Sequence, residues 1–158
     1  MNAKPFLEII ASAFHHRRLD AVMIGNAAAA INGAPVTTLD IDFLVANTPE
    51  NYRKLAAIAQ DLNCQFIELK LPDDNYMYRL AHKEEPLVID ILFALSGIKS
   101  MAVLKKNAMP VKFGKHMLLV AALADIIRSK KAAGRPKDLA TIPILELTLN
   151  EKAHTQTP

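Results

Sequence analysis

The stretch Ala21-Val-Met-Ile-Gly-Asn-Ala27, continued after a gap by Asp40-Ile-Asp-Phe-Leu-Val45, decides the fold of this chain. It predicts an apolar strand, a Gly-Asn turn, a short alanine-rich helix and a second apolar strand that carries two aspartates. Because side chains alternate between the faces of a strand, Asp40 and Asp42 are expected to point the same way. Two adjacent carboxylates repel each other unless a cation lies between them. Mg²⁺ is the natural candidate, because it prefers oxygen ligands.

The turn before this second strand has the residue types of a phosphate site. Gly25 lets the backbone approach a ligand closely, and Asn26 is suited to cap a helix over Ala27–Asn32. The free N–H groups at such a helix start bind phosphate well. Taken alone, the turn has an ordinary interpretation as a strand-to-helix connection, and the aspartates as a solvated strand end. Their order along the chain favours a phosphate site beside a metal site.

A third aspartate lies in a later apolar run. Residues Pro86-Leu-Val-Ile-Asp-Ile-Leu-Phe-Ala94 are nearly all apolar, as expected of a strand that is covered on both faces. Asp90 is in the middle of this run, where an uncompensated carboxylate is costly. Two interpretations stay open. Asp90 forms a structural ion pair with a lysine or arginine elsewhere, or it converges with Asp40 and Asp42 from a neighbouring strand.

Basic residues gather where two helices are expected to meet. A helix over about residues 121–133 is predicted to end at Gly134, and another to begin at Pro136. The basic residues near this point are Arg128, Lys130, Lys131, Arg135 and Lys137. They form either a solvated helix end or a phosphate clamp in which Arg135 binds through two N–H groups. Asp138 is expected to pair with one of these bases rather than with a metal.

The remaining elements follow from hydrophobic spacing and turn residues. Thr48 and Pro49 have the residue types of a helix cap and a first helical turn. Periodicity further predicts helices over residues 4–18 and 98–107, strands over 64–70 and 76–81, and a hairpin around Gly114.

Length and composition predict one globular domain. The chain has 158 residues, of which 51% are hydrophobic and 22% charged, values typical of a folded protein. We expect a single domain over residues 1–150 and a frayed tail over 151–158. One cysteine excludes a disulfide framework. Without a long apolar run or a signal peptide, we expect a cytoplasmic protein outside the membrane. A net charge of +3 is too small to indicate nucleic-acid binding by itself.

Together these motifs resemble the signature of the polymerase-β-like nucleotidyltransferase superfamily. In that signature a Gly-Gly or Gly-Ser pair is followed, after a short helix, by a strand with the pattern Asp-x-Asp. Here Gly25-Asn26 and Asp40-Ile-Asp42 have this spacing, and Leu87–Leu92 and Lys130–Asp138 resemble two further family segments. The match spans most of residues 20–142 and is strongest to small bacterial single-domain members of the abortive-infection toxin type.

Two positions differ from the family pattern. Asn26 stands where the family usually has serine or glycine, and Val36 stands where many relatives have arginine. In the family pattern, both positions help to bind the triphosphate. They favour an alternative hypothesis, in which the chain is a non-catalytic module that binds a nucleotide or a partner without turnover. A metal-dependent phosphohydrolase is a third hypothesis.

The resemblance implies an α/β (α+β) fold, with a mixed twisted sheet flanked by helices. It also implies a Mg²⁺- or Mn²⁺-dependent enzyme that moves a nucleoside monophosphate group from an NTP such as ATP to an acceptor. The acceptor classes are tRNA, a protein and a small molecule, and a protein partner of toxin–antitoxin type is a further expectation. The implied catalytic and metal-binding residues are Asp40, Asp42 and Asp90. The implied nucleotide-binding residues are Gly25, Asn26, Thr38, Lys130, Arg135 and Lys137.

Overall fold

The structure, a computed structural model, describes residues 4–155. The helices are α1 (Lys4–Arg17), α2 (Gly25–Ile31), α3 (Pro49–Asp61), α4 (Met101–Asn107), α5 (Leu123–Ala133) and α6 (Pro136–Thr155), with a 3₁₀ turn η1 at Pro72–Asp74. The strands are β1 (Ala21–Ile24), β2 (Ile41–Val45), β3 (Cys64–Lys70), β4 (Tyr76–His82), β5 (Val88–Leu92), β6 (Met109–Phe113) and β7 (His116–Val120). None of the described helices is long and apolar enough to cross a membrane.

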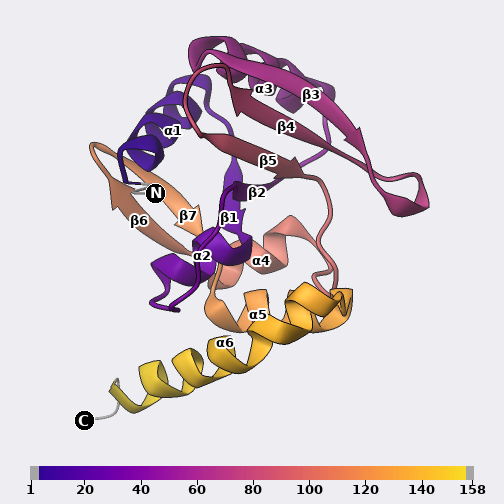
Figure 1. Ribbon diagram of the computed structural model, residues 1–158. Helices are drawn as coiled ribbons and strands as arrows, with labels where there is room; N and C mark the ends of the chain where they lie inside the picture. Colours follow the sequence, from indigo (N-terminus) through magenta and orange to yellow (C-terminus); the bar gives the residue numbers. More distant parts are fainter. Residues whose placement is uncertain (1–3, 156–158) are drawn as a thin grey trace.

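The strands form one mixed sheet in the order β3-β4-β5-β2-β1-β7-β6 (Figure 1). The β2–β5 and β1–β7 pairs are parallel, and the other neighbouring pairs are antiparallel. Helices α1 and α3 pack against each other, with α1 on β7 and α3 on β3, while α2 packs on β1, β2 and α5. The expected α/β fold with a mixed sheet is confirmed.

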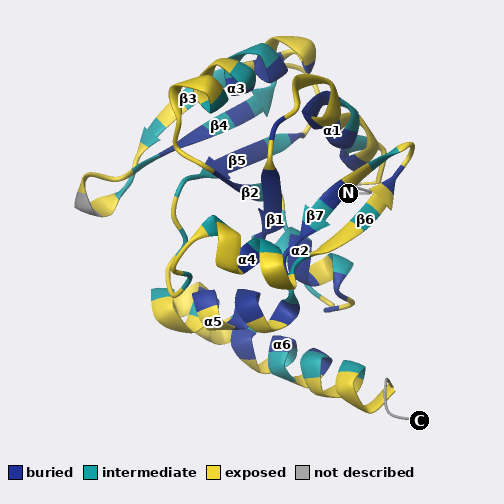
Figure 2. Ribbon diagram, turned by 180° about the vertical axis from the view of Figure 1, so that it is seen from behind, coloured by how far each residue is buried: buried dark blue, intermediate teal, exposed yellow. Residues whose placement is uncertain are grey.

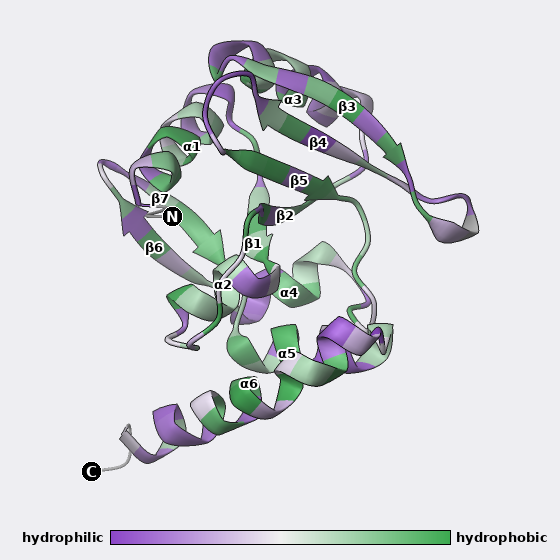
Figure 3. Cartoon of the chain, in the orientation of Figure 1, coloured by the Kyte–Doolittle hydropathy of each residue, from purple (hydrophilic) through white to green (hydrophobic). Residues whose placement is uncertain are grey.

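The central strands are buried because their sequences are apolar almost throughout. Every residue of β1 is buried, and so are the residues at the middle of β2 and β5 (Figure 2). Figure 3 shows the same strands as mainly hydrophobic, with hydrophilic residues gathered where α5 meets α6. Phe43, Ile89 and Ile91 have no exposed surface, so the site that these strands carry rests on a rigid core.

Two helix boundaries follow the expected capping chemistry. The Thr48 hydroxyl accepts a hydrogen bond from the backbone N–H of Asn51 at 3.1 Å, and Pro49 is the first residue of α3. Gly134 closes α5 with a left-handed backbone, φ 65°. This conformation is easy for glycine and strained for other residues. Both predicted caps are therefore confirmed.

The predicted cap at Asn26 is wrong. Helix α2 begins at Gly25, so Ile24 takes the N-cap position and Asn26 lies inside the first helical turn without a capping hydrogen bond. The helix starts two residues earlier than expected because Gly25 adopts a φ of +69°, which most residues avoid. A Cβ at this position would also lie 2.5 Å from Oδ2 of Asp42, so the glycine leaves room for that carboxylate.

The end of the chain differs from the expected frayed tail. Helix α6 continues to Thr155, and its last turns project from the body of the molecule (Figure 1). Extending an existing helix costs far less than starting a new one. The Nζ of Lys152 also donates to Oδ1 of the buried Asn32 at 2.9 Å, which ties this end to α2. Residues 156–158 of the expected tail lie outside the described residues.

The close approach of Gly25 to Asp42 predicts the effect of adding a methyl group. Gly25→Ala should lower the free energy of unfolding by about 1–3 kcal/mol more than Gly33→Ala does, as measured by urea denaturation. Gly33 is the matched control, because it also has a positive φ, +99°, but a Cβ added there would meet no atom within 4 Å.

The Asp42→Ala background tests the cause of this difference. Removing the carboxylate should abolish the extra cost of Gly25→Ala and leave only its backbone strain. Equal costs for the two glycine substitutions in the native background would contradict a steric role for Asp42.

Candidate active site

A polar cavity lies at the end of the central strands. Its volume is about 390 Å³, within the range of ligand sites, and it is lined by the β1–α2 turn, β2, β4, β5, α5 and α6. The expected site residues that line it are Gly25, Asn26, Thr38, Asp40, Asp42, Asp90, Lys130, Arg135 and Lys137. All nine residues, drawn from segments more than a hundred positions apart, therefore meet at one cavity.

Three carboxylates converge on one side of this cavity. Asp42 and Asp90 are neighbours in the parallel β2–β5 pair, and Asp40 stands just before β2. One oxygen of each aspartate lies within 4.8 Å of the others. The prediction that Asp90 converges with Asp40 and Asp42 from a neighbouring strand agrees with this geometry.

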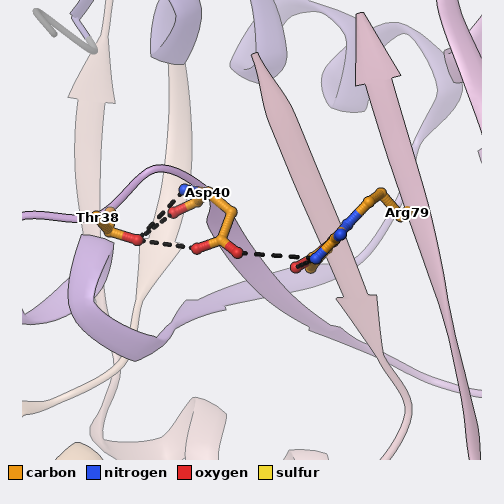
Figure 4. A network of polar contacts seen from close by, with 4 residues as sticks. Thr38, Asp40 and Arg79 are labelled. Atoms are coloured by element: carbon orange, nitrogen blue, oxygen red, sulfur yellow. Dashed lines mark hydrogen bonds and ion pairs between the residues drawn. The ribbon is translucent and has the colours of Figure 1, made fainter. Parts of the chain in front are cut away.

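The ion-pair interpretation of Asp90 also holds, and its partner is Arg79. The Nε and Nη2 of Arg79 donate to the two oxygens of Asp90 at 2.8 and 2.9 Å. Nη2 also lies 3.9 Å from Oδ2 of Asp40 (Figure 4). Sequence reasoning missed Arg79. The available signal was a lone charge in an otherwise uncharged strand, but its position opposite Asp90 depends on the β4–β5 register.

Thr38 holds the first aspartate in place. Its hydroxyl lies 2.9 Å from Oδ1 and 2.8 Å from the carbonyl oxygen of Asp40, and it accepts the backbone N–H of Asp40 at 3.3 Å (Figure 4). This threonine therefore lines the cavity while its hydroxyl contacts a carboxylate. Its expected contact with a nucleotide stays a prediction.

Asp42 is the least compensated of the three carboxylates. No hydrogen bond or ion pair to its side chain is found within residues 4–155, whereas Asp90 is paired with Arg79. Burial, followed by the charges of Asp40 and Asp90, raises the pKa of Asp42 to about 7, against the opposing effect of Lys137 and Lys130. A bound cation at this point would relieve the repulsion.

Asn26 contributes a second uncompensated oxygen. Its Oδ1 is the buried side-chain polar atom that lacks a hydrogen-bond partner in the described part of the chain. Such atoms are rare in folded proteins, because an unpaired buried acceptor costs about 1–3 kcal/mol. The cavity thus contains hard oxygen donors without partners at both Asn26 and Asp42, and this donor set suits a divalent cation.

The part of the cavity lining that comes from α5, α6 and the residues between them is basic. We call Lys130, Arg135 and Lys137, where α5 meets α6, the basic wall. The Nε of Arg135 donates to Asp138 at 2.6 Å, and Nζ of Lys130 lies 3.5 Å from the same carboxylate. Asp138 is only 1% exposed. Burial raises its pKa, but the Arg135 hydrogen bond and the charges of Arg135 and Lys130 hold the pKa below its usual value.

The pairing of Asp138 with these bases was expected and is confirmed. It fixes Arg135 and Lys130 beside the cavity. The side chain of Lys137, by contrast, forms no ion pair with any residue that the structure describes. The basic wall therefore combines two anchored cations with one that is available to a ligand.

Comparison with known proteins identifies the fold. No protein-family model and no curated protein matches this sequence. Among solved structures, the chain resembles the antibiotic-resistance factor ANT(2'')-Ia in complex with adenylyl-2''-tobramycin, with a TM-score of 0.62, 15% identity, and coverage of 98% of this chain and 94% of the other.

A second similar structure comes from Thermotoga maritima and is described provisionally as a nucleotidyltransferase. The TM-score is 0.59 with 18% identity, and the match covers 96% of each chain. Both likenesses span nearly the whole of each protein, including the strands and helices that line the cavity. The chain therefore has the nucleotidyltransferase fold.

Proposed function

We propose that this chain is a divalent-metal-dependent nucleotidyltransferase, which moves a nucleoside monophosphate group from an NTP to an acceptor. The observation that carries the proposal is the division of charge in the cavity. Asp40, Asp42 and Asp90 lie together in its lining, and the basic wall lines it where α5 meets α6. A metal–triphosphate complex has matching parts, because the carboxylates suit the cation and the lysines and arginine suit the phosphates.

Asp40 and Asp42 are the residues that would hold the divalent ion, with Asp90 as the third carboxylate of the set. The unpaired oxygens at Asp42 and Asn26 support this assignment. When bound, such an ion neutralises phosphate oxygens and activates the attacking hydroxyl. Lys130, Arg135 and Lys137 neutralise and orient the triphosphate, and the close backbone at Gly25 lets phosphate approach the β1–α2 turn.

The acceptor is proposed by class. The similar structure of ANT(2'')-Ia holds an adenylylated small molecule, so a hydroxyl on a small molecule is the first acceptor class to test and ATP the first donor. Hydroxyls on tRNA and on proteins are the other two classes, and a toxin-type role would require one of them. These alternatives differ in acceptor but use the same carboxylates.

The rival proposal is a module that binds nucleotide without turnover. Its support is the Arg79–Asp90 pair. The Arg79 guanidinium bonds both oxygens of Asp90, a carboxylate that the resemblance assigns to the catalytic metal site. The unusual Asn26 adds to it. Nucleotide binding is common to both proposals, so only turnover separates them.

Pyrophosphate release tests the proposed function. The purified chain, given ATP, Mg²⁺ and pooled acceptors of the three classes, should release pyrophosphate and label one acceptor class from α-labelled ATP. Asp40→Asn should reduce the rate at least a hundredfold, because it removes a charge that holds the metal. Asp61→Asn is the control, since Asp61 pairs with Arg17 on the surface, away from the residues that line the cavity. Binding of ATP without pyrophosphate release or label would favour the rival.

The basic wall predicts a separate effect on nucleotide affinity. Lys137→Ala should weaken ATP binding about tenfold or more in isothermal titration, because it removes a charge-assisted contact with phosphate. The free energy of unfolding should change by less than about 0.5 kcal/mol, since this lysine has no ion pair to lose among the described residues.

Lys131→Ala is the matched control for this substitution. Lys131 lies on the same pair of helices, but its Nζ contacts Glu146 and it does not line the cavity. Its ATP affinity should stay within about twofold of the native protein. An unchanged affinity in Lys137→Ala would mean that the basic wall is a solvated helix end.

A further inference from the structure

The Arg79 guanidinium occupies a position that belongs to the carboxylate cluster itself. It forms two hydrogen bonds to Asp90 and lies 3.9 Å from Oδ2 of Asp40. Side-by-side N–H groups of arginine match the two oxygens of a carboxylate, so this pair is fixed in orientation as well as in charge. The Asp90 side chain is only 6% exposed, so the pair with Arg79 offsets the cost of burying its charge.

The sheet holds this arginine in place. Arg79 is directly opposite Asp90 in the antiparallel β4–β5 pair, and Asp90 is next to Asp42 in the parallel β5–β2 pair. All three residues are on strands of one continuous sheet, with fixed registers. A surface arginine would lose little by moving away, but departure of Arg79 would leave a buried carboxylate unpaired.

Charge and oxygen counts both point to a single divalent ion. When all three carboxylates are ionised, as metal ligands are, they carry a charge of −3. Arg79 carries +1, which leaves −2, the charge that one divalent ion balances. Both Asp90 oxygens already accept N–H groups, and the carboxylate without a hydrogen bond among the described residues is Asp42. The vacant oxygens and the remaining charge therefore both lie on the Asp40–Asp42 side.

We propose that Arg79 acts as the second cation of this site. It neutralises Asp90 and positions it, and the Asp40–Asp42 side binds one divalent ion in the absence of nucleotide. The inference rests on the proposed function, because it assumes that the carboxylates bind a metal. In this proposal Arg79 holds Asp90 in position, and Asp90 is not itself a metal ligand. Arg79 thereby determines how many divalent ions the protein binds.

Counting bound Mn²⁺ tests the proposal without any activity measurement. Electron paramagnetic resonance of the nucleotide-free protein, titrated with Mn²⁺, should give one bound ion per native chain. Arg79→Gln keeps a hydrogen-bond donor but removes the charge, so a second Mn²⁺ should bind. Arg79→Lys restores the charge and should return the count to one. Arg17→Gln is the control, because Arg17 forms a similar two-bond pair with Asp61 away from the cavity.

The double variant Arg79→Gln/Asp90→Asn removes a pair that is neutral overall. If Asp90 is a partner of Arg79 and not a ligand, this variant should bind one Mn²⁺ with an affinity within about threefold of the native protein. A loss of tenfold or more would overturn the proposal. This measurement also decides the question if Arg79→Gln alone does not fold, since the double variant leaves no buried charge of this pair without its partner.

The outcomes separate this inference from the proposed function. Two Mn²⁺ ions in the native chain, or one ion in both the native chain and folded Arg79→Gln, would overturn the role of Arg79 while leaving metal-dependent transfer intact. No Mn²⁺ binding to the native chain would overturn both proposals.

Discussion

Three aspartates meet at the adjacent strands β2 and β5, and the repulsion among their charges is the constraint on which the rest of the site depends. A carboxylate buried beside two others is stable only with a proton, a metal or a basic side chain. The structure provides Arg79 for Asp90 and a threonine hydroxyl for Asp40. Asp42 is left with a raised pKa. A carboxylate whose charge has no basic partner is typical of sites that bind a cation. If protein groups balanced every charge, a metal ion would gain little by binding.

Other features of the fold follow from holding these groups together. Gly25 is required where the β1–α2 turn passes the Asp42 carboxylate, because its backbone is left-handed and any Cβ would collide. Asp138 plays the corresponding part on the basic wall, where one buried carboxylate anchors two cations beside the cavity. Carboxylates therefore occur in two roles here: three of them share one guanidinium, that of Arg79, whereas Asp138 alone anchors two cations.

The sequence predicted what depends on local patterns. The alternation in Asp40–Val45, the apolar run around Asp90 and the turn chemistry at Thr48 and Gly134 each reflect neighbours along the chain, and the structure agrees with them. The Arg79–Asp90 pair could not be predicted, because it depends on a register between strands that one sequence does not contain. The predicted cap at Asn26 was wrong because glycine can take a positive φ, and this freedom moved the helix start two residues earlier, to Gly25.

The pH dependence of stability in Asp42→Asn is the sharpest test of this charge repulsion. The pKa of Asp42 is about 7 in the folded chain and near 3.9 in an unfolded one. Between these values the folded state binds more protons, so the contribution of Asp42 to stability falls as pH rises and is least favourable above pH 7. In EDTA, we expect Asp42→Asn to gain stability relative to the native protein between about pH 5 and pH 8, as measured by urea unfolding. Millimolar Mg²⁺ at pH 8 should stabilise only the native protein. A difference between the two proteins that is the same at both pH values and unaffected by Mg²⁺ would show that Asp42 is neither strained by its neighbours nor a metal ligand.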